Sequence, residues 1–287
     1  MLQPAPSRPL PPGHVEWAIA RAQSGADAKL LLQPLLDAGW EESAAAEALD
    51  AAMRDFLQRH ALEHGLPRLL QVPSPIEGND AGILRLPDRE VQVLASLLLP
   101  RVIVFGGLLS AEECAGFIEF ARPQLRRSET LNLETGADEN HAARTSEGVY
   151  LQRGQDELCR RVEARIANLL DWPMENGEGL QVLRYGPGAE YKPHYDYFDP
   201  ARAGTAATLA RGGQRVASLV MYLNTPARGG TTVFPDANFE VSAIGGNAVF
   251  FSYDRPHPMT RTLHGGAPVR EGEKWILTKW LRTGPHA

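Results

Sequence analysis

The sequence predicts an α+β fold, in which an antiparallel β sandwich or jelly roll carries packed helices and follows a small N-terminal helical region. Three observations predict this class. Short β-type runs fill the C-terminal half without helices between them, whereas the first 64 residues are rich in Ala and Leu at helical spacing. The 287 residues, 43% of them hydrophobic, are enough for one full domain core and a smaller appendage.

The N-terminal region is expected to be helical over residues 14–64. Apolar residues recur there every three or four positions, as at Leu31 and Leu35, and Gly39 marks a helix stop between two such series. Residues 65–86 contain three prolines and a Gly-Asn-Asp run, which prevent helix continuation and favour turns. We therefore expect two domains: residues 1–86 form the helical region with its linker, and residues 87–287 form the main domain.

The first part of the main domain is predicted to be mostly helical. A helix over residues 88–99 ends at Pro100, and a buried strand follows over residues 101–105. Ser110 and Glu113 form a capping box, which opens a helix that ends near Pro123. After a polar, irregular segment at residues 128–143, a second helix covers about residues 155–170.

The second part is predicted to be a β structure. Five β-type runs are bounded by Gly and Pro, at residues 181–185, 215–223, 231–234, 247–253 and 274–282. Strands at this spacing without helices between them form an antiparallel sandwich or jelly roll, with the earlier helices packed on one sheet. The Ala- and Gly-rich residues 201–213 are expected to be a mobile surface loop that could close over a site.

Composition argues against several classes of protein. The formal net charge is −6 and basic residues form only pairs, so nucleic acid is not an expected partner. No apolar stretch has the length of a signal peptide or a membrane span, so we expect no membrane association and a cytoplasmic location. Cys114 and Cys159 lie far apart in predicted helices and are expected to be buried thiols rather than a disulfide.

A metal site is indicated around residue 194. His194 and Asp196 are two positions apart, so on an extended chain their side chains point from one face and can reach the same ion. His264 lies beyond the predicted strand at residues 247–253, where a neighbouring strand could bring it alongside this pair. Two histidines and one carboxylate leave other positions of a metal open, as in non-haem iron(II) oxygenases. These three residues are a weak signal alone, and the flanking residues strengthen it.

Lys274 suggests an anion near this metal. On a strand it shares a face with Ile276, Thr278 and Trp280, whereas Lys279 points the opposite way. A lysine on an apolar interior face needs an anion, because an unpaired buried ammonium is costly. The far carboxylate of 2-oxoglutarate could supply this anion while its 2-oxo acid end chelates iron. The alternative, a lysine that extends to solvent at a strand end, stays open.

Five ordered motifs surround these residues. They are Gln181-Val-Leu-Arg-Tyr185-Gly-Pro-Gly188, Tyr191-Lys-Pro-His194-Tyr-Asp196, Arg215 through Met221-Tyr-Leu-Asn224, Gly229-Gly-Thr-Thr232-Val-Phe-Pro235, and His264-Gly-Gly-Ala-Pro-Val269 through Gly272-Glu-Lys274-Trp. Together they resemble the catalytic domain of prolyl 4-hydroxylases, a family of iron(II)- and 2-oxoglutarate-dependent dioxygenases. The resemblance covers about residues 100–283.

The resemblance implies a double-stranded β-helix form of the jelly roll, with its ligand-bearing core at about residues 178–283. It implies Fe(II), 2-oxoglutarate and O2, with ascorbate to restore oxidised iron, and a prolyl residue of a peptide or protein as substrate. The metal centre carries the chemistry, with no further catalytic residue expected. The implied contacts are His194, Asp196 and His264 to the metal, Lys274, Tyr185 and Thr232 to the far carboxylate of 2-oxoglutarate, and Tyr191, Arg215 and Trp280 to the substrate.

The chain departs from the family in two places. Ala267 stands where the family usually has Cys, which we interpret as a packing change because the position is not a ligand. Residues 1–86 have no counterpart in the catalytic core of the family. We expect the N-terminal helices to dock on the catalytic domain or on a partner.

Three alternatives remain at this stage. The same iron chemistry could hydroxylate another residue or a free amino acid. Two histidines and a carboxylate also suit catalytic zinc, so a zinc hydrolase is possible, although it leaves Lys274 unexplained and no His-Glu-x-x-His helix is present. A non-catalytic binding or sensing protein could use the same scaffold, although intact ligands argue against it.

Overall fold

The structure, a computed structural model, describes residues 10–11, 13–76, 82–127, 130–131, 138–139 and 145–286. The chain divides into two compact units, Met1–Leu69 and Leu70–Ala287, and each is described by itself. None of the helices among the described residues is both long and apolar enough to cross a membrane.

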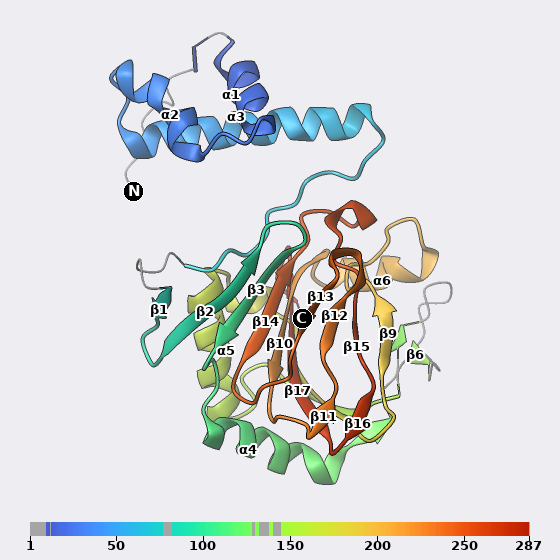
Figure 1. The fold of residues 1–287 in the computed structure, drawn as a ribbon. Coiled ribbons are helices and arrows are strands. Elements are labelled where there is room, and N and C mark those ends of the chain that lie inside the picture. The colour runs from blue at the N-terminus through green and yellow to red at the C-terminus, as the bar shows by residue number, and fades with distance from the viewer. Residues whose placement is uncertain are drawn as a thin grey trace. The chain divides into compact units, whose positions relative to one another are not determined.

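The first unit consists of three helices, α1 (His14–Gln23), α2 (Ala28–Asp37) and α3 (Glu42–Glu63) (Figure 1). The Asp27 side chain accepts a hydrogen bond from the Leu30 N–H and caps α2. Gly39 follows α2 with a φ of 80°, so the predicted helix stop is confirmed. The helices bury a small apolar core that comprises Ala18, Leu31, Leu35, Trp40, Ala45 and Leu49.

Residues 70–76 and 82–86, which the sequence suggests are linker, pack with the second unit. The Leu70 N–H donates to the Asp254 carbonyl at 2.7 Å, and the Ile76 N–H donates to the Leu169 carbonyl at 2.9 Å. Leu84 and Leu86 are buried in the larger of the two apolar cores of the second unit, which is called the main core below. The boundary between the compact units therefore falls between Leu69 and Leu70 rather than at residue 86, because apolar side chains in this Pro-rich segment are buried in the larger unit.

A nine-stranded antiparallel sheet forms the base of the second unit. Its strand order is β1-β2-β3-β14-β10-β17-β8-β7-β4. The strands in that order are Ile83–Arg85, Glu90–Leu97, Arg101–Gly106, Ala248–Ser252, Arg215–Tyr222, Lys274–Arg282, Leu180–Tyr185, Glu147–Leu151 and Arg126–Arg127.

A four-stranded sheet faces part of this base, in the order β13-β12-β15-β9 (Figure 1). Buried side chains from both sheets, among them Val220 and Phe251 from the large sheet and Phe234 and Val241 from the small one, form a common core. This sandwich confirms the predicted jelly-roll class. The small strands are Phe239–Val241, Thr232–Phe234, His264–Gly266 and Tyr191–His194, and two further pairs are β11 (Arg228–Gly229) with β16 (Val269–Glu271) and β5 (Thr130–Leu131) with β6 (Asp138–Glu139).

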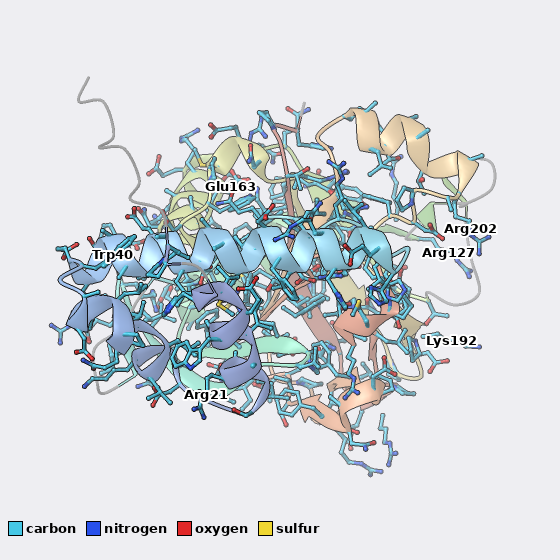
Figure 2. All side chains as sticks on the ribbon, turned by 90° about the horizontal axis from the view of Figure 1, so that it is seen from above. Arg21, Trp40, Arg127, Glu163, Lys192 and Arg202 are labelled. Atoms are coloured by element: carbon cyan, nitrogen blue, oxygen red, sulfur yellow. The ribbon has the colours of Figure 1, made fainter. Side chains whose placement is uncertain are left out.

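Helices α4 (Ala111–Ala121) and α5 (Glu157–Leu170) contribute side chains to the main core, which also contains side chains from the large sheet. The Ser110–Glu113 capping box is present at the start of α4, as predicted. The buried Lys279 Nζ donates to Glu163 Oε1 at 2.5 Å, which ties β17 to α5. Figure 2 labels Glu163 on this helix. Lys279 thus belongs to the helix-covered face, opposite to Lys274, as the strand alternation predicts.

The helix predicted over residues 88–99 is wrong, because strand β2 occupies residues 90–97 and pairs with β1 and β3. Burial alternates along it, with Val91 buried and the neighbouring Gln92 exposed. The apolar residues of this short run fit the period of a helix as well as that of a strand. Pairing with β3 selects the strand, and the β-branched valines also favour it. The predicted strands at residues 101–105, 181–185, 215–223, 231–234, 247–253 and 274–282 and the helix near 155–170 are confirmed.

Residues 201–213 are not an unstructured loop. They contain the 3-10 turn Ala203–Thr205 and the short helix α6 (Ala206–Ala210), and Thr205 and Thr208 are buried. The proposed closing role of this segment stays a prediction. The polar residues 128–143 lie mostly outside the described part of the chain, apart from β5 and β6. The remaining 3-10 turns are Arg122–Gln124, Met174–Asn176, Pro235–Ala237 and Pro258–Thr260.

Candidate active site

Strands β9 and β15 bring three candidate metal ligands together. His194 ends β9 and His264 begins β15, and the two residues are register partners in the small sheet (Figure 1). Asp196 lies two residues beyond His194. Its Oδ1 is 3.4 Å from His194 Nε2, and its Oδ2 is 3.5 Å from His264 Nε2. One ligand atom from each residue lies within 4.8 Å of the others, which is close enough for one ion to contact all three.

Both imidazoles present the same nitrogen to this centre. His194 Nδ1 is 2.9 Å from the Lys192 carbonyl oxygen, and His264 Nδ1 is 3.0 Å from the Thr262 carbonyl oxygen. A carbonyl oxygen only accepts, so each Nδ1 carries the proton and each Nε2 keeps a lone pair for a metal. Burial lowers the pKa of His264 to about 4, so its ring is neutral near pH 7.

Asp196 is buried and ionised. Burial by itself opposes the negative charge, but His264, His194 and Arg215 outweigh it and hold the pKa of Asp196 far below its usual range. The buried Asp196 carboxylate thus faces the Nε2 atoms of both imidazoles. Two imidazole nitrogens and one carboxylate oxygen are the donor set of non-haem iron(II) oxygenases, so the residues fit Fe(II).

A second layer of polar side chains from the large sheet orients Asp196. Ser218 on β10 donates to Asp196 Oδ2 at 2.5 Å, and Ser218 Oγ is 3.1 Å from the Tyr253 hydroxyl oxygen. An ionised carboxylate only accepts, so Ser218 gives its one proton to Asp196 and Tyr253 must donate to Ser218. The sequence analysis missed both residues, and the available signal was a serine inside an otherwise apolar strand.

Lys274 is 3% exposed, and no carboxylate among the described residues pairs with it. Burial lowers its pKa to about 8. Its Nζ lies 5.7 Å from the ring centres of both Tyr185 and Tyr222, and Tyr185 is its register partner across β8 and β17. The Tyr222 hydroxyl donates to Thr232 Oγ1 at 2.8 Å. The structure thus brings Lys274, Tyr185 and Thr232 together and adds Tyr222, which the sequence analysis missed, while the role of these residues toward a ligand stays a prediction.

This arrangement fits a buried anion. An ammonium without a carboxylate partner is costly in an apolar interior, and hydroxyl groups beside it can complete the binding of a carboxylate. A dicarboxylate such as 2-oxoglutarate therefore suits the chemistry of this pocket.

Of the three predicted substrate residues, Tyr191 and Arg215 contact candidate metal ligands, and Trp280 contacts Arg215. The Tyr191 ring stacks on His194 with centroids 3.7 Å apart. The Arg215 guanidinium lies 4.2 Å from the centre of the Trp280 ring and is fixed by two bonds to Glu178, at 2.6 and 2.9 Å. The Trp280 indole N–H is buried without a hydrogen-bond partner among the described residues.

Sequence comparison finds one matching superfamily and similar proteins from one family within it. The 2OG-Fe(II) oxygenase superfamily matches residues 180–282. Probable prolyl 4-hydroxylase 3 of Arabidopsis thaliana is 38% identical over 208 residues, which cover 65% of this chain and 71% of that protein. Prolyl 4-hydroxylase 5 of Arabidopsis thaliana is 38% identical over 203 residues, which cover 63% and 68%.

Among solved structures, the viral collagen prolyl hydroxylase of Paramecium Bursaria Chlorella virus-1, determined with 2OG, is 29% identical and matches with a TM-score of 0.49. That match covers 63% of this chain and 95% of the viral protein.

Proposed function

This chain belongs to the prolyl 4-hydroxylase family, and from that membership we propose that it hydroxylates prolyl residues of a peptide or protein. It is an Fe(II)- and 2-oxoglutarate-dependent dioxygenase. Family membership decides against the zinc hydrolase that the three ligands alone would allow.

The convergence of His194, Asp196 and His264 beside Lys274, which has no carboxylate partner among the described residues, carries the proposal. The two Nε2 atoms and the Asp196 carboxylate would hold Fe(II), and Lys274, Tyr185 and Thr232 would hold the far carboxylate of 2-oxoglutarate. When bound, iron, 2-oxoglutarate and O2 supply the oxidation that places one oxygen atom on the substrate as hydroxyl and the other in succinate, with release of CO2.

The side chains around the centre would position the substrate and exclude water. The Tyr191 ring would contact a prolyl ring, and the buried Trp280 N–H, which has no hydrogen-bond partner among the described residues, would donate to a substrate carbonyl. Arg215 donates two hydrogen bonds to Glu178 and is thereby held against Trp280, so this part of the site is ordered before substrate binds.

The proposal includes ascorbate. Ascorbate would restore iron that is oxidised when turnover proceeds without substrate. The cytoplasmic location and the docking of the N-terminal helices stay predictions.

The first experiment measures succinate formation by protein purified without oxygen and supplied with Fe(II), 2-oxoglutarate, O2 and ascorbate. Asp196→Ala serves as the blank. Proline-containing peptides should stimulate succinate formation and gain the mass of one oxygen atom on proline. Stimulation by free amino acids alone would favour the alternative substrate class, and absence of succinate above the blank would refute the assignment.

A further inference from the structure

The last turn of α3 in the N-terminal unit carries a second cluster of metal-binding side chains. His60, Glu63 and His64 are exposed, and one ligand atom from each lies within 4.8 Å of the others. Positions separated by three and four residues share one face of a helix, so the cluster follows directly from the sequence His60-Ala-Leu-Glu63-His64. The sequence analysis missed this His-x-x-Glu-His spacing, which places two imidazoles on one helical face as zinc ligands in some metalloproteins.

The His64 ring is oriented like the rings of the active-site histidines. Its Nδ1 lies 2.8 Å from the His60 carbonyl oxygen, so Nδ1 donates the proton and Nε2 keeps its lone pair. The same Nδ1-to-carbonyl arrangement occurs at His194 and His264. Metal-binding histidines commonly use such a bond to fix the ring and its tautomer. The rings of His60 and His64 lie with their centres 4.0 Å apart, so both can face one ion.

The local charge also favours a cation. The cluster lies at the C-terminal end of a helix that is continuous over Glu42–Glu63, where the carbonyl groups carry partial negative charge (Figure 2). Glu63 adds a formal negative charge, and among the described residues no Lys or Arg pairs with it. The two nearest ion pairs on α3, Arg54–Asp50 and Arg59–Asp55, use other side chains.

We propose that His60, Glu63 and His64 form a second metal site, which binds Zn²⁺ and is separate from the dioxygenase centre. Two imidazoles and one carboxylate are suitable zinc ligands, and water or a side chain of another molecule completes the coordination. The site is exposed and imposes no cavity, so the order of intrinsic affinities applies and Zn²⁺ binds it more tightly than Fe²⁺. The proposal is independent of the function proposed for residues 180–282.

The test measures bound zinc per chain by equilibrium dialysis of the full-length protein followed by elemental analysis. Asp196→Ala is the starting protein, because loss of this ligand weakens the active-site centre. The test variant adds His60→Gln and His64→Gln to this starting protein. The matched control variant instead adds Arg54→Gln, on the same helix. The double substitution should lose one equivalent of zinc relative to the Asp196→Ala protein, whereas the control should lose none.

A second variant separates ligand loss from misfolding. His60→Gln alone keeps the carbonyl that orients His64, so the helix should be retained in circular dichroism while the equivalent of zinc is lost. Equal zinc content with and without His60 and His64 would overturn the proposal. When Asp196 is left intact, the protein with His60→Gln and His64→Gln should form succinate as fast as the protein without substitutions. Failure of the zinc site and failure of the dioxygenase assignment therefore give different results.

Discussion

Replacing Lys274 by Met should stabilise the protein in the absence of ligands and weaken its use of 2-oxoglutarate. Burial lowers the pKa of Lys274 from 10.5 to about 8, which means that the folded protein disfavours the ammonium. At about 1.36 kcal/mol per pKa unit, this difference corresponds to roughly 3 kcal/mol of lost stability at pH 7. Met fills similar space without a charge, so the free energy of unfolding should rise by up to roughly that amount.

The pH dependence of this gain has a defined sign. The folded pKa of Lys274 lies below the unfolded value, so the cost of the charge is fully present below about pH 8. It decreases as the pH rises, and it is gone above 10.5, where the lysine is neutral in both states. Urea unfolding of the metal-free variant and parent at several pH values measures this difference.

The same substitution removes the proposed partner of the 2-oxoglutarate carboxylate. Truncating one member of a buried charge pair costs about 2–5 kcal/mol, and about 1.4 kcal/mol is a factor of ten. The apparent KM for 2-oxoglutarate in the succinate assay should therefore rise at least about 30-fold, while iron stays bound. Lys192→Met, at an exposed lysine on β9, is the control and should change neither quantity. An unchanged KM in the Lys274 variant would refute its assigned role.

Three further predictions concern the groups around the metal. Asp196→Ala should abolish turnover and iron retention, and activity in this variant would exclude Asp196 as a ligand. Ser218→Ala should lower metal affinity about 10- to 100-fold in a Co²⁺ titration of the metal-free protein, because Asp196 loses its hydrogen-bond donor, and Ser218→Thr should restore it. Glu178→Gln should destabilise the protein by about 3–5 kcal/mol in urea unfolding, because Arg215 and Arg282 both lose a buried countercharge; a change below about 1 kcal/mol would contradict this account.

The β core was predictable because its strands have strong local signals. The alternation in residues 274–282 separates Lys274 from Lys279, and the structure places Lys274 among residues of the inter-sheet core while Lys279 pairs with Glu163 of α5. Residues 88–99 were not predictable in the same way. A run with apolar residues at several spacings fits a helix or a strand, and the choice depends on pairing with β3, which lies outside the segment.

The residues of the candidate site also divide into those that the sequence predicts and those that it does not. His194 and Asp196 are two positions apart in sequence, so an extended chain predicts that they converge, although Asp196 lies in a bend just beyond β9. Ser218 and Tyr222 reach the site from β10, and Tyr253 reaches it from just beyond β14. Their roles depend on partners that are 22, 10 and 35 positions away. Polar residues within apolar strands were the signal, but such residues identify no partner until the sheets are placed.

The site depends on the packing of the two sheets against each other. His194 and His264 belong to the small sheet, whereas Ser218, which holds Asp196, and Lys274 belong to the large sheet. The His264 ring contacts the Phe251 ring of the large sheet, with centroids 4.4 Å apart. A shift of one sheet relative to the other would therefore separate the proposed metal ligands from the serine that donates to the Asp196 carboxylate and from the lysine proposed to bind the far end of 2-oxoglutarate. The core between the sheets fixes both distances, so its packing sets the catalytic geometry as well as the stability of the fold.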